Sequence, residues 1–103
     1  MSQDVWLVDD DHAIRWVLER ALQQAQISSR SFEDGQQLLA ALEADTPKLI
    51  VSDIRMPGID GLSLLQRLQH QIAHVPVIIM TAHSDLDSAV ACYQGGAFDY
   101  LPK

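Results

Sequence analysis

The sequence predicts a doubly wound α/β fold built on a five-stranded parallel sheet. Short apolar segments alternate along the chain with stretches of helical periodicity, which is the pattern of repeated strand–helix–strand units. Segments such as Val77–Met80 are continuously apolar, which favours strands that helices cover on both faces. The length of 103 residues, with 48% hydrophobic and 20% charged residues, fits one globular domain spanning residues 1–103.

The expected strands are Val5–Val8, roughly Ser28–Phe32, Leu49–Ser52, Val77–Thr81 and Ala97–Leu101. Between the first two, apolar residues recur at intervals of three and four and share one helix face: Ile14, Val17, Leu18, Ala21, Leu22 and Ala25. Asp11 precedes this helix, where an N-cap role is favoured over a metal-ligand role. Trp16 lies about 200° around the helix from Ile14. It is equally compatible with an exposed contact anchor and with packing on a neighbouring helix.

Three further helices are expected between the remaining strands. Their spaced apolar residues are Leu38, Leu39 and Leu42; Leu62, Leu65, Leu68 and Ile72; and Leu86, Ala89, Val90 and Tyr93. The third helix should start near Asp60-Gly61, and Gly95-Gly96 should end the fourth. The chain ends at Lys103, directly after the fifth strand. A doubly wound sheet needs helices on both faces, so we expect the domain to be truncated there, with its final helix missing from this chain.

Bulk properties narrow the classes of function. The net charge is −7, from 14 acidic and 7 basic residues, which argues against nucleic-acid binding by this domain because phosphate contacts need a basic surface. No run of about 18 apolar residues predicts a membrane span, and no basic leader precedes the first strand. Cys92 is the only cysteine, which fits a reducing compartment and predicts a cytoplasmic protein.

Acidic residues stand where two of the expected strands end. Asp9, Asp10 and Asp11 follow the first strand, and Asp53 follows the third, at the sheet edge where open α/β folds bind ligands. If these strands are neighbours, several carboxylates crowd one pocket, and two unit charges about 4 Å apart repel by roughly 4 kcal/mol at an effective dielectric near 20. A hard cation such as Mg²⁺ would offset this repulsion. A carboxylate beside bound Mg²⁺ can attack a phosphoryl group.

A hydroxyl and an ammonium group are expected at the same edge. Thr81 ends the fourth strand and Lys103 follows the fifth. In a sheet of strand order 2-1-3-4-5, strands 1, 3, 4 and 5 end along one edge, so these groups would meet the carboxylates in one pocket. With these motifs, the whole chain resembles the receiver domain of bacterial two-component response regulators, which has the flavodoxin/CheY-like form of this fold. The stretches Ile14–Leu22, Met80–Val90 and Tyr93–Lys103 resemble the NtrC nitrogen-regulation type.

The resemblance implies a role for each motif position. Asp53 would accept a phosphoryl group from a phosphohistidine on a sensor histidine kinase. Asp10, Asp53 and the backbone carbonyl of Arg55 would bind Mg²⁺, with Asp9 acting through water. Thr81 would hydrogen-bond the phosphoryl oxygens and Lys103 would pair with them.

Three further positions are implied to regulate the phosphorylated state. Tyr100 matches the switch aromatic that responds with Thr81, and the resemblance favours this role over that of an ordinary half-buried strand aromatic. Arg55 and His83 stand where receivers tune the lifetime of the phosphate, and an ordinary loop residue is equally compatible at both positions.

The resemblance also implies a wider context. The domain would not be an enzyme, apart from slow autodephosphorylation. A transcription-activating output would follow it, comprising an ATPase domain that acts with σ54 polymerase and a DNA-binding domain, both outside this chain. The apolar surface left by the expected missing helix also predicts a possible homodimer.

Two other classes remain as alternatives. A small phosphatase with an aspartyl-phosphate intermediate would usually carry a second aspartate two residues after its nucleophile, where this chain has Arg55. A flavodoxin-like cofactor-binding domain would need a phosphate-cradling loop after the first strand, where three aspartates would repel a flavin phosphate.

Overall fold

The computed structural model describes residues 4–54, 56, 58–81 and 96–102. Its elements, in chain order, are β1 (Val5–Val8), α1 (His12–Gln24), β2 (Ser29–Phe32), α2 (Gly35–Ala41), β3 (Leu49–Asp53), α3 (Gly61–Gln71), β4 (Val77–Thr81) and β5 (Asp99–Pro102). Each predicted strand is present, with β5 starting two residues later than expected. The predicted fourth helix lies outside the described residues.

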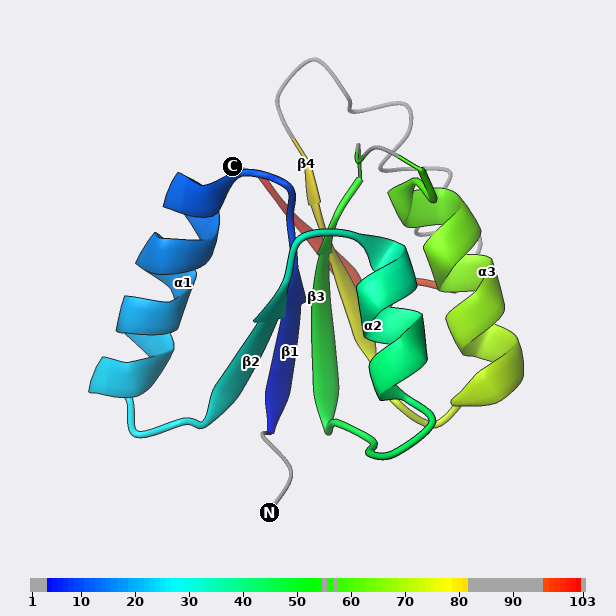
Figure 1. Ribbon diagram of the computed structural model, residues 1–103, viewed down its shortest axis with the longest axis horizontal. Coiled ribbons are helices and arrows are strands. Elements are labelled where there is room, and N and C mark those ends of the chain that lie inside the picture. The colour runs from blue at the N-terminus through cyan, green and yellow to red at the C-terminus, as the bar shows by residue number, and fades with distance from the viewer. Residues whose placement is uncertain (1–3, 55, 57, 82–95, 103) are drawn as a thin grey trace.

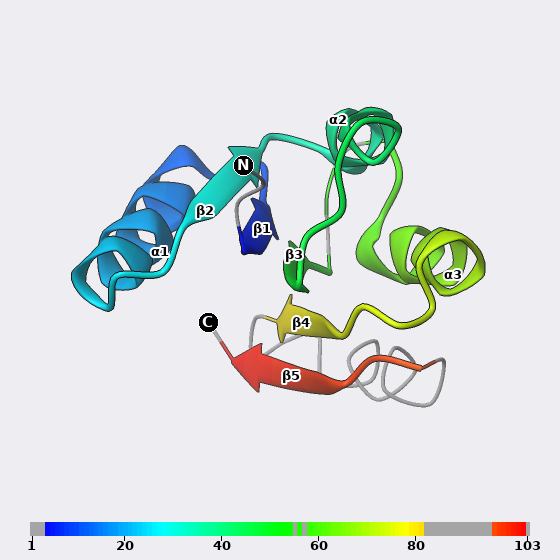
Figure 2. The same ribbon diagram turned by 90° about the horizontal axis from the view of Figure 1, so that it is seen from below.

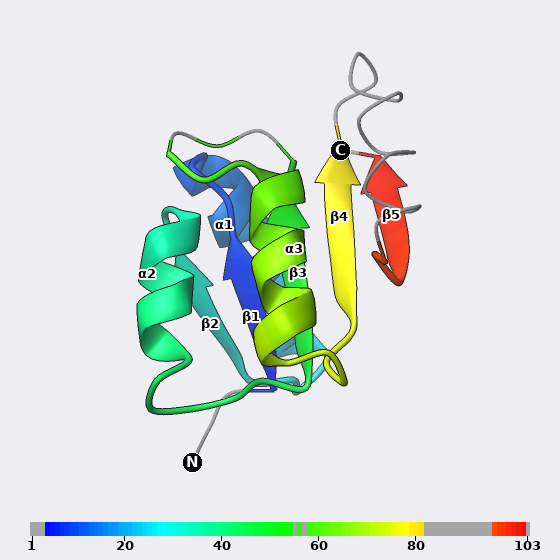
Figure 3. The same cartoon turned by 90° about the vertical axis from the view of Figure 1, so that its right-hand side faces the viewer.

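The five strands form one parallel sheet in the order β2-β1-β3-β4-β5, so the predicted doubly wound α/β fold is confirmed. Helix α1 covers one face of the sheet, and α2 and α3 cover the other (Figures 1 and 2). Figure 3, viewed from the side of α2 and α3, shows both helices in front of the strands with α1 behind. Since all strands point the same way, their C-terminal ends lie along one edge of the sheet.

The two faces of the sheet are buried to different extents. Strand residues alternate between the faces, so Trp6, Val8, Ile50 and Ile79 join the large core under α2 and α3. Val5, Leu7, Val51 and Met80 face α1, where the partly buried Ile14, Leu18 and Leu22 pack against them. The core that fixes the sheet therefore lies mainly on the side of α2 and α3.

Helix α1 corrects one detail of the predicted apolar face. No residue of α1 is buried; Val17, which we expected on the contact face, is 56% exposed, and Ala21 and Ala25, expected on the same face, are exposed too. Val17 lies about 60° around the helix from Ile14, at the border of the contact stripe, where the described residues leave it uncovered. Trp16 is 55% exposed, and the Arg20 guanidinium lies over its ring, 5.2 Å from the ring centroid; among the described residues it is not buried against another helix.

Aspartates cap the three described helices. Asp11 and Asp60, both expected near helix starts, accept hydrogen bonds from the N–H groups of Ala13 and Ser63 at 2.9 and 2.8 Å. Asp34 caps α2 in the same way. Such caps satisfy N–H groups that a helix start leaves without partners. None of these helices has the length and apolar content to cross a membrane.

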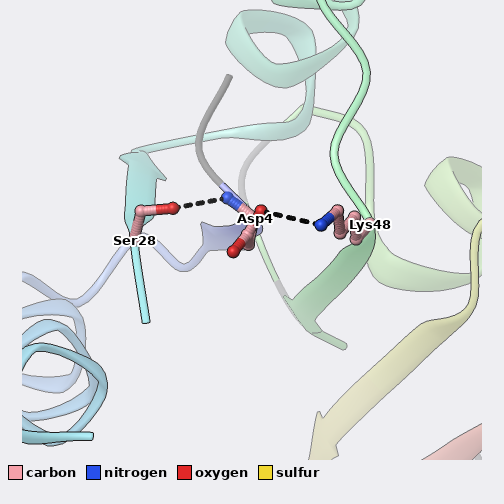
Figure 4. A network of polar contacts seen from close by, with 3 residues as sticks. All are labelled: Asp4, Ser28 and Lys48. Carbon is pink, nitrogen blue, oxygen red and sulfur yellow. Dashed lines mark hydrogen bonds and ion pairs between the residues drawn. The ribbon is translucent and has the colours of Figure 1, made fainter. Parts of the chain in front are cut away.

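The opposite edge of the sheet, where β1 begins, is tied together by Asp4. Its N–H donates to the Ser28 hydroxyl at 2.9 Å, and its carboxylate lies 3.5 Å from the Lys48 ammonium (Figure 4). The Asp4 carbonyl also accepts from the N–H groups of Lys48 and Leu49. These contacts hold the segments leading into β1, β2 and β3 in register.

Candidate functional site

Three carboxylates meet where β1 and β3 end. The two strands are neighbours, and Val8 of β1 pairs with Ser52 of β3. The residues that follow them in sequence, Asp9 and Asp53, therefore lie side by side. Ligand oxygens of Asp9, Asp10 and Asp53 all lie within 4.8 Å of one another. The structure therefore brings together the three acidic residues that the sequence predicted to share a site.

Asp9 forms the buried floor of the turn after β1. Its side chain is fully buried, and its Oδ1 accepts a hydrogen bond from the N–H of Asp11 at 2.9 Å. Its backbone N–H continues the sheet by donating to the Phe32 carbonyl, and its carbonyl accepts from Arg15 Nη1 at 2.6 Å. Several independent bonds therefore fix Asp9, whereas Asp10, the next residue, is exposed at the mouth of the site.

Asp53 is the last residue of β3 and is 4% exposed. The hydroxyl of the buried Ser52 donates to the Asp53 carbonyl at 2.9 Å. The Ile54 N–H donates to the Met80 carbonyl of β4. Hydrogen bonds on both sides therefore hold the backbone around Asp53. The Asp53 carboxylate belongs to a cluster in which Asp10 is the exposed member.

Gly61 allows helix α3 to approach the end of β3. A Cβ atom at this position would lie 2.6 Å from both the Asp53 carbonyl oxygen and the Ile54 Cα, a separation that only a hydrogen can occupy. The Gly61 N–H donates to the Ile54 carbonyl at 2.9 Å. The sequence marked Gly61 only as a helix start, so this contact with the site was missed. Its signal was the Asp60-Gly61 pair itself.

The donor atoms of the cluster fit a small, hard divalent cation. All are carboxylate oxygens, which Mg²⁺ prefers. Two ligands about 2.1 Å from a Mg²⁺ ion stand at most about 4.2 Å apart, slightly less than the 4.8 Å that bounds this cluster. A pair of these acids at the upper end of that range would bind the ion with one member acting through a water molecule or shifting by a fraction of an ångström.

The other predicted site residues are placed only in part. The Thr81 backbone ends β4, one residue beyond Met80, which pairs with Asp53, so Thr81 reaches the same edge of the sheet. The Tyr100 backbone lies in β5 and pairs with Ile79. Lys103, Arg55 and His83 lie outside the described residues.

Arg15 is a residue near the site that sequence reasoning did not single out. Its guanidinium reaches back from the second turn of α1 to the loop that carries the acids. The signal for it was an arginine shortly after three aspartates, at a position where a helix would bring its side chain over the preceding loop.

Comparisons with known proteins agree with this geometry. The family model described as "Response regulator receiver domain" matches residues 5–103. The chain is 62% identical over 99 residues to the DNA-binding transcriptional regulator NtrC of Salmonella typhimurium, which covers 96% of this chain and 21% of that protein. It is 46% identical to the C4-dicarboxylate transport transcriptional regulatory protein DctD of Pseudomonas aeruginosa, with the same coverage.

A solved structure supports the same comparison. The apo receiver domain of Nitrogen Regulatory Protein C, determined in solution, is 60% identical and superposes with a TM-score of 0.87, covering 98% of this chain and 82% of that one. The chain spans about a fifth of the length of the curated relatives it matches. The resemblance inferred from the motifs is confirmed.

Proposed function

We propose that this chain, which belongs to the response regulator receiver domain family, accepts a phosphoryl group on Asp53. The supporting observation is that Asp53 is nearly buried and lies with Asp9 and Asp10 in a cluster whose oxygens are within 4.8 Å of one another. Like charges this close are unfavourable without a cation. A site that gathers them at the edge of a parallel sheet is suited to bind Mg²⁺ and an anionic group together.

The reaction would be a transfer between a nitrogen and a carboxylate oxygen. An Asp53 oxygen attacks the phosphorus of a phosphohistidine, the N–P bond breaks, and its electron pair remains on the imidazole nitrogen. The product is an acyl phosphate on Asp53. Bound Mg²⁺ would neutralise charge on the phosphoryl oxygens. Asp10, Asp53 and the Arg55 carbonyl are its proposed ligands, with Asp9 acting through water.

Thr81 and Lys103 are proposed to bind the transferred group. A hydroxyl at the end of β4 would donate to a phosphoryl oxygen, and the ammonium of Lys103 would pair with another. The added negative charge would pull Thr81 toward the site and free space for Tyr100, which biases a two-state element. Arg55 and His83 are proposed to set how fast water removes the phosphate, a slow autodephosphorylation rather than a dedicated enzymatic activity.

The partners follow from the family and its relatives. The chain would act in the cytoplasm, and a sensor histidine kinase would supply the phosphoryl group. Similar proteins are named as transcriptional regulators, which supports an output in a full-length protein that joins this domain to an ATPase domain and a DNA-binding domain. The 62% identity to NtrC favours nitrogen regulation as the process controlled. The receiver domain itself would bind no nucleic acid, in keeping with its net charge of −7.

Labelling with a small phosphodonor tests this proposal. Acetyl phosphate and Mg²⁺ should add one phosphoryl group to the chain, detected by intact mass, and Asp53→Asn should abolish it. The matched control is Asp4→Asn, which changes an acid at the other end of the same sheet and should label normally. Undiminished labelling of the Asp53→Asn variant would refute the assignment of Asp53.

A further inference from the structure

We propose that Arg15 is a positioning residue for the acidic site. It holds the peptide group between Asp9 and Asp10, so that both carboxylates face one cation, and thereby sets the affinity for Mg²⁺. This inference rests on the proposed function, because it assumes that the cluster of Asp9, Asp10 and Asp53 is the Mg²⁺ site.

Arg15 is bonded on both sides of Asp10. Its side-chain Nη1 donates to the Asp9 carbonyl at 2.6 Å, and its backbone N–H donates to the Asp11 carbonyl at 3.1 Å. The Asp9 carbonyl belongs to the peptide group that leads into Asp10. The Arg15 side chain therefore fixes the peptide group that enters Asp10, while its backbone N–H forms the first hydrogen bond of α1 with the carbonyl one residue beyond Asp10.

Asp10 is the acid that depends most on this support. The Asp9 carboxylate is buried and accepts from the Asp11 N–H, and the Asp11 carboxylate caps α1 by accepting from Ala13. The carboxylate of Asp10 is exposed and takes part in neither of these two hydrogen bonds. Its direction is therefore governed by its backbone, which Arg15 holds.

The sign of the effect separates positioning from charge. A positive guanidinium near the site repels a cation, so if charge alone mattered, removing Arg15 would tighten Mg²⁺ binding. If positioning dominates, removing Arg15 frees the loop and weakens binding. Groups that orient metal ligands typically contribute about 10–100-fold to metal affinity, which exceeds the effect of a charge screened by solvent and salt.

The experiment measures Mg²⁺ affinity by calorimetry in the chain and in Arg15→Met, with labelling by acetyl phosphate across a Mg²⁺ titration. We expect Mg²⁺ to bind Arg15→Met about tenfold more weakly. Half-maximal labelling should need correspondingly more Mg²⁺, and the maximal labelling rate should stay within about twofold, because the occupied site is unchanged. Arg15→Lys, which keeps the charge but lacks the planar fork of donors, should give an intermediate affinity.

Arg20→Met is the matched control. It removes the same charge from the same helix, but Arg20 lies over Trp16, five residues further along α1, and should leave Mg²⁺ affinity unchanged within about twofold. Equal or tighter binding by Arg15→Met, or an equal loss in Arg20→Met, would overturn the role of Arg15. So would a fall in the maximal labelling rate at saturating Mg²⁺. Absence of Mg²⁺ binding by the unsubstituted chain would instead overturn the proposed function itself.

Discussion

The two edges of the sheet use aspartate in opposite ways. Asp4 precedes β1 and lies 3.5 Å from the Lys48 ammonium, with both side chains substantially exposed. Asp9 follows the same strand, is fully buried, and lies with Asp10 and Asp53 in a cluster whose ligand oxygens are within 4.8 Å of one another. Only the four residues of β1 separate Asp4, which lies next to a lysine, from Asp9, which lies beside other carboxylates.

The difference separates an edge that serves stability from the edge that carries the proposed function. At the N-terminal edge, charge pairing and backbone hydrogen bonds tie β1, β2 and β3 together, and little repulsion is left. At the C-terminal edge, folding gathers like charges, which costs stability that the proposed binding of a cation would offset. Such a local cost is typical of a binding site. Substitutions at the two edges should therefore differ in sign and in their dependence on Mg²⁺.

Gly61→Ala should give the largest loss of stability, because the added methyl group would clash with backbone atoms at the C-terminal end of β3. The new methyl would meet the Asp53 and Ile54 backbone at 2.6 Å, and overpacking against a rigid backbone costs about 3 kcal/mol. Denaturant unfolding would measure this loss of stability. Labelling of Asp53 by acetyl phosphate should also slow, because the strand end carrying Asp53 must shift.

Gly35→Ala is the matched control for this substitution. Gly35 also begins a helix behind an aspartate cap, but a Cβ there would meet Leu64 and Ile59 side-chain atoms at 3.4 Å or more. Its free energy of unfolding should change by less than about 1 kcal/mol. Equal losses at the two glycines would show that close approach to Asp53 is not what Gly61 provides.

The contrast between Gly61 and Gly35 also shows what the sequence could predict. Alternating apolar segments identified the strands, and the acids that follow β1 and β3 identified the site, because both signals are local or follow from the parallel arrangement. The 2.6 Å approach at Gly61 and the contact of Arg15 with Asp9 depend on how the elements pack. The local sequence marks these two positions, as an Asp-Gly pair and as an arginine after three aspartates, but does not give the contacts. The exposure of Val17 has the same origin: periodicity gave the helix face but not the part of it that the sheet covers.

Asp10→Asn should reverse its effect on stability when Mg²⁺ is added. Without Mg²⁺, removing one of three clustered charges should stabilise the chain by about 1 kcal/mol, since Asp10 is exposed and solvent screens part of the repulsion. With Mg²⁺, the unsubstituted chain gains binding free energy that the variant largely lacks, and their order should invert. Thermal unfolding with and without Mg²⁺ measures the stability difference in each condition. A variant less stable than the unsubstituted chain in both conditions would contradict this account.

Lys48→Met at the N-terminal edge should have the smallest effect. The Lys48 side chain is 83% exposed and that of Asp4 46%, and ion pairs this open to solvent contribute about 0.2–1 kcal/mol at most. We expect a loss of less than about 0.5 kcal/mol at moderate salt, because the Lys48 N–H still donates to the Asp4 carbonyl. The loss should shrink further as salt screens the pair and should not depend on Mg²⁺. A loss that changed with Mg²⁺ would mean that the two edges are coupled through β1, and that the separation of stability from function along this strand is wrong.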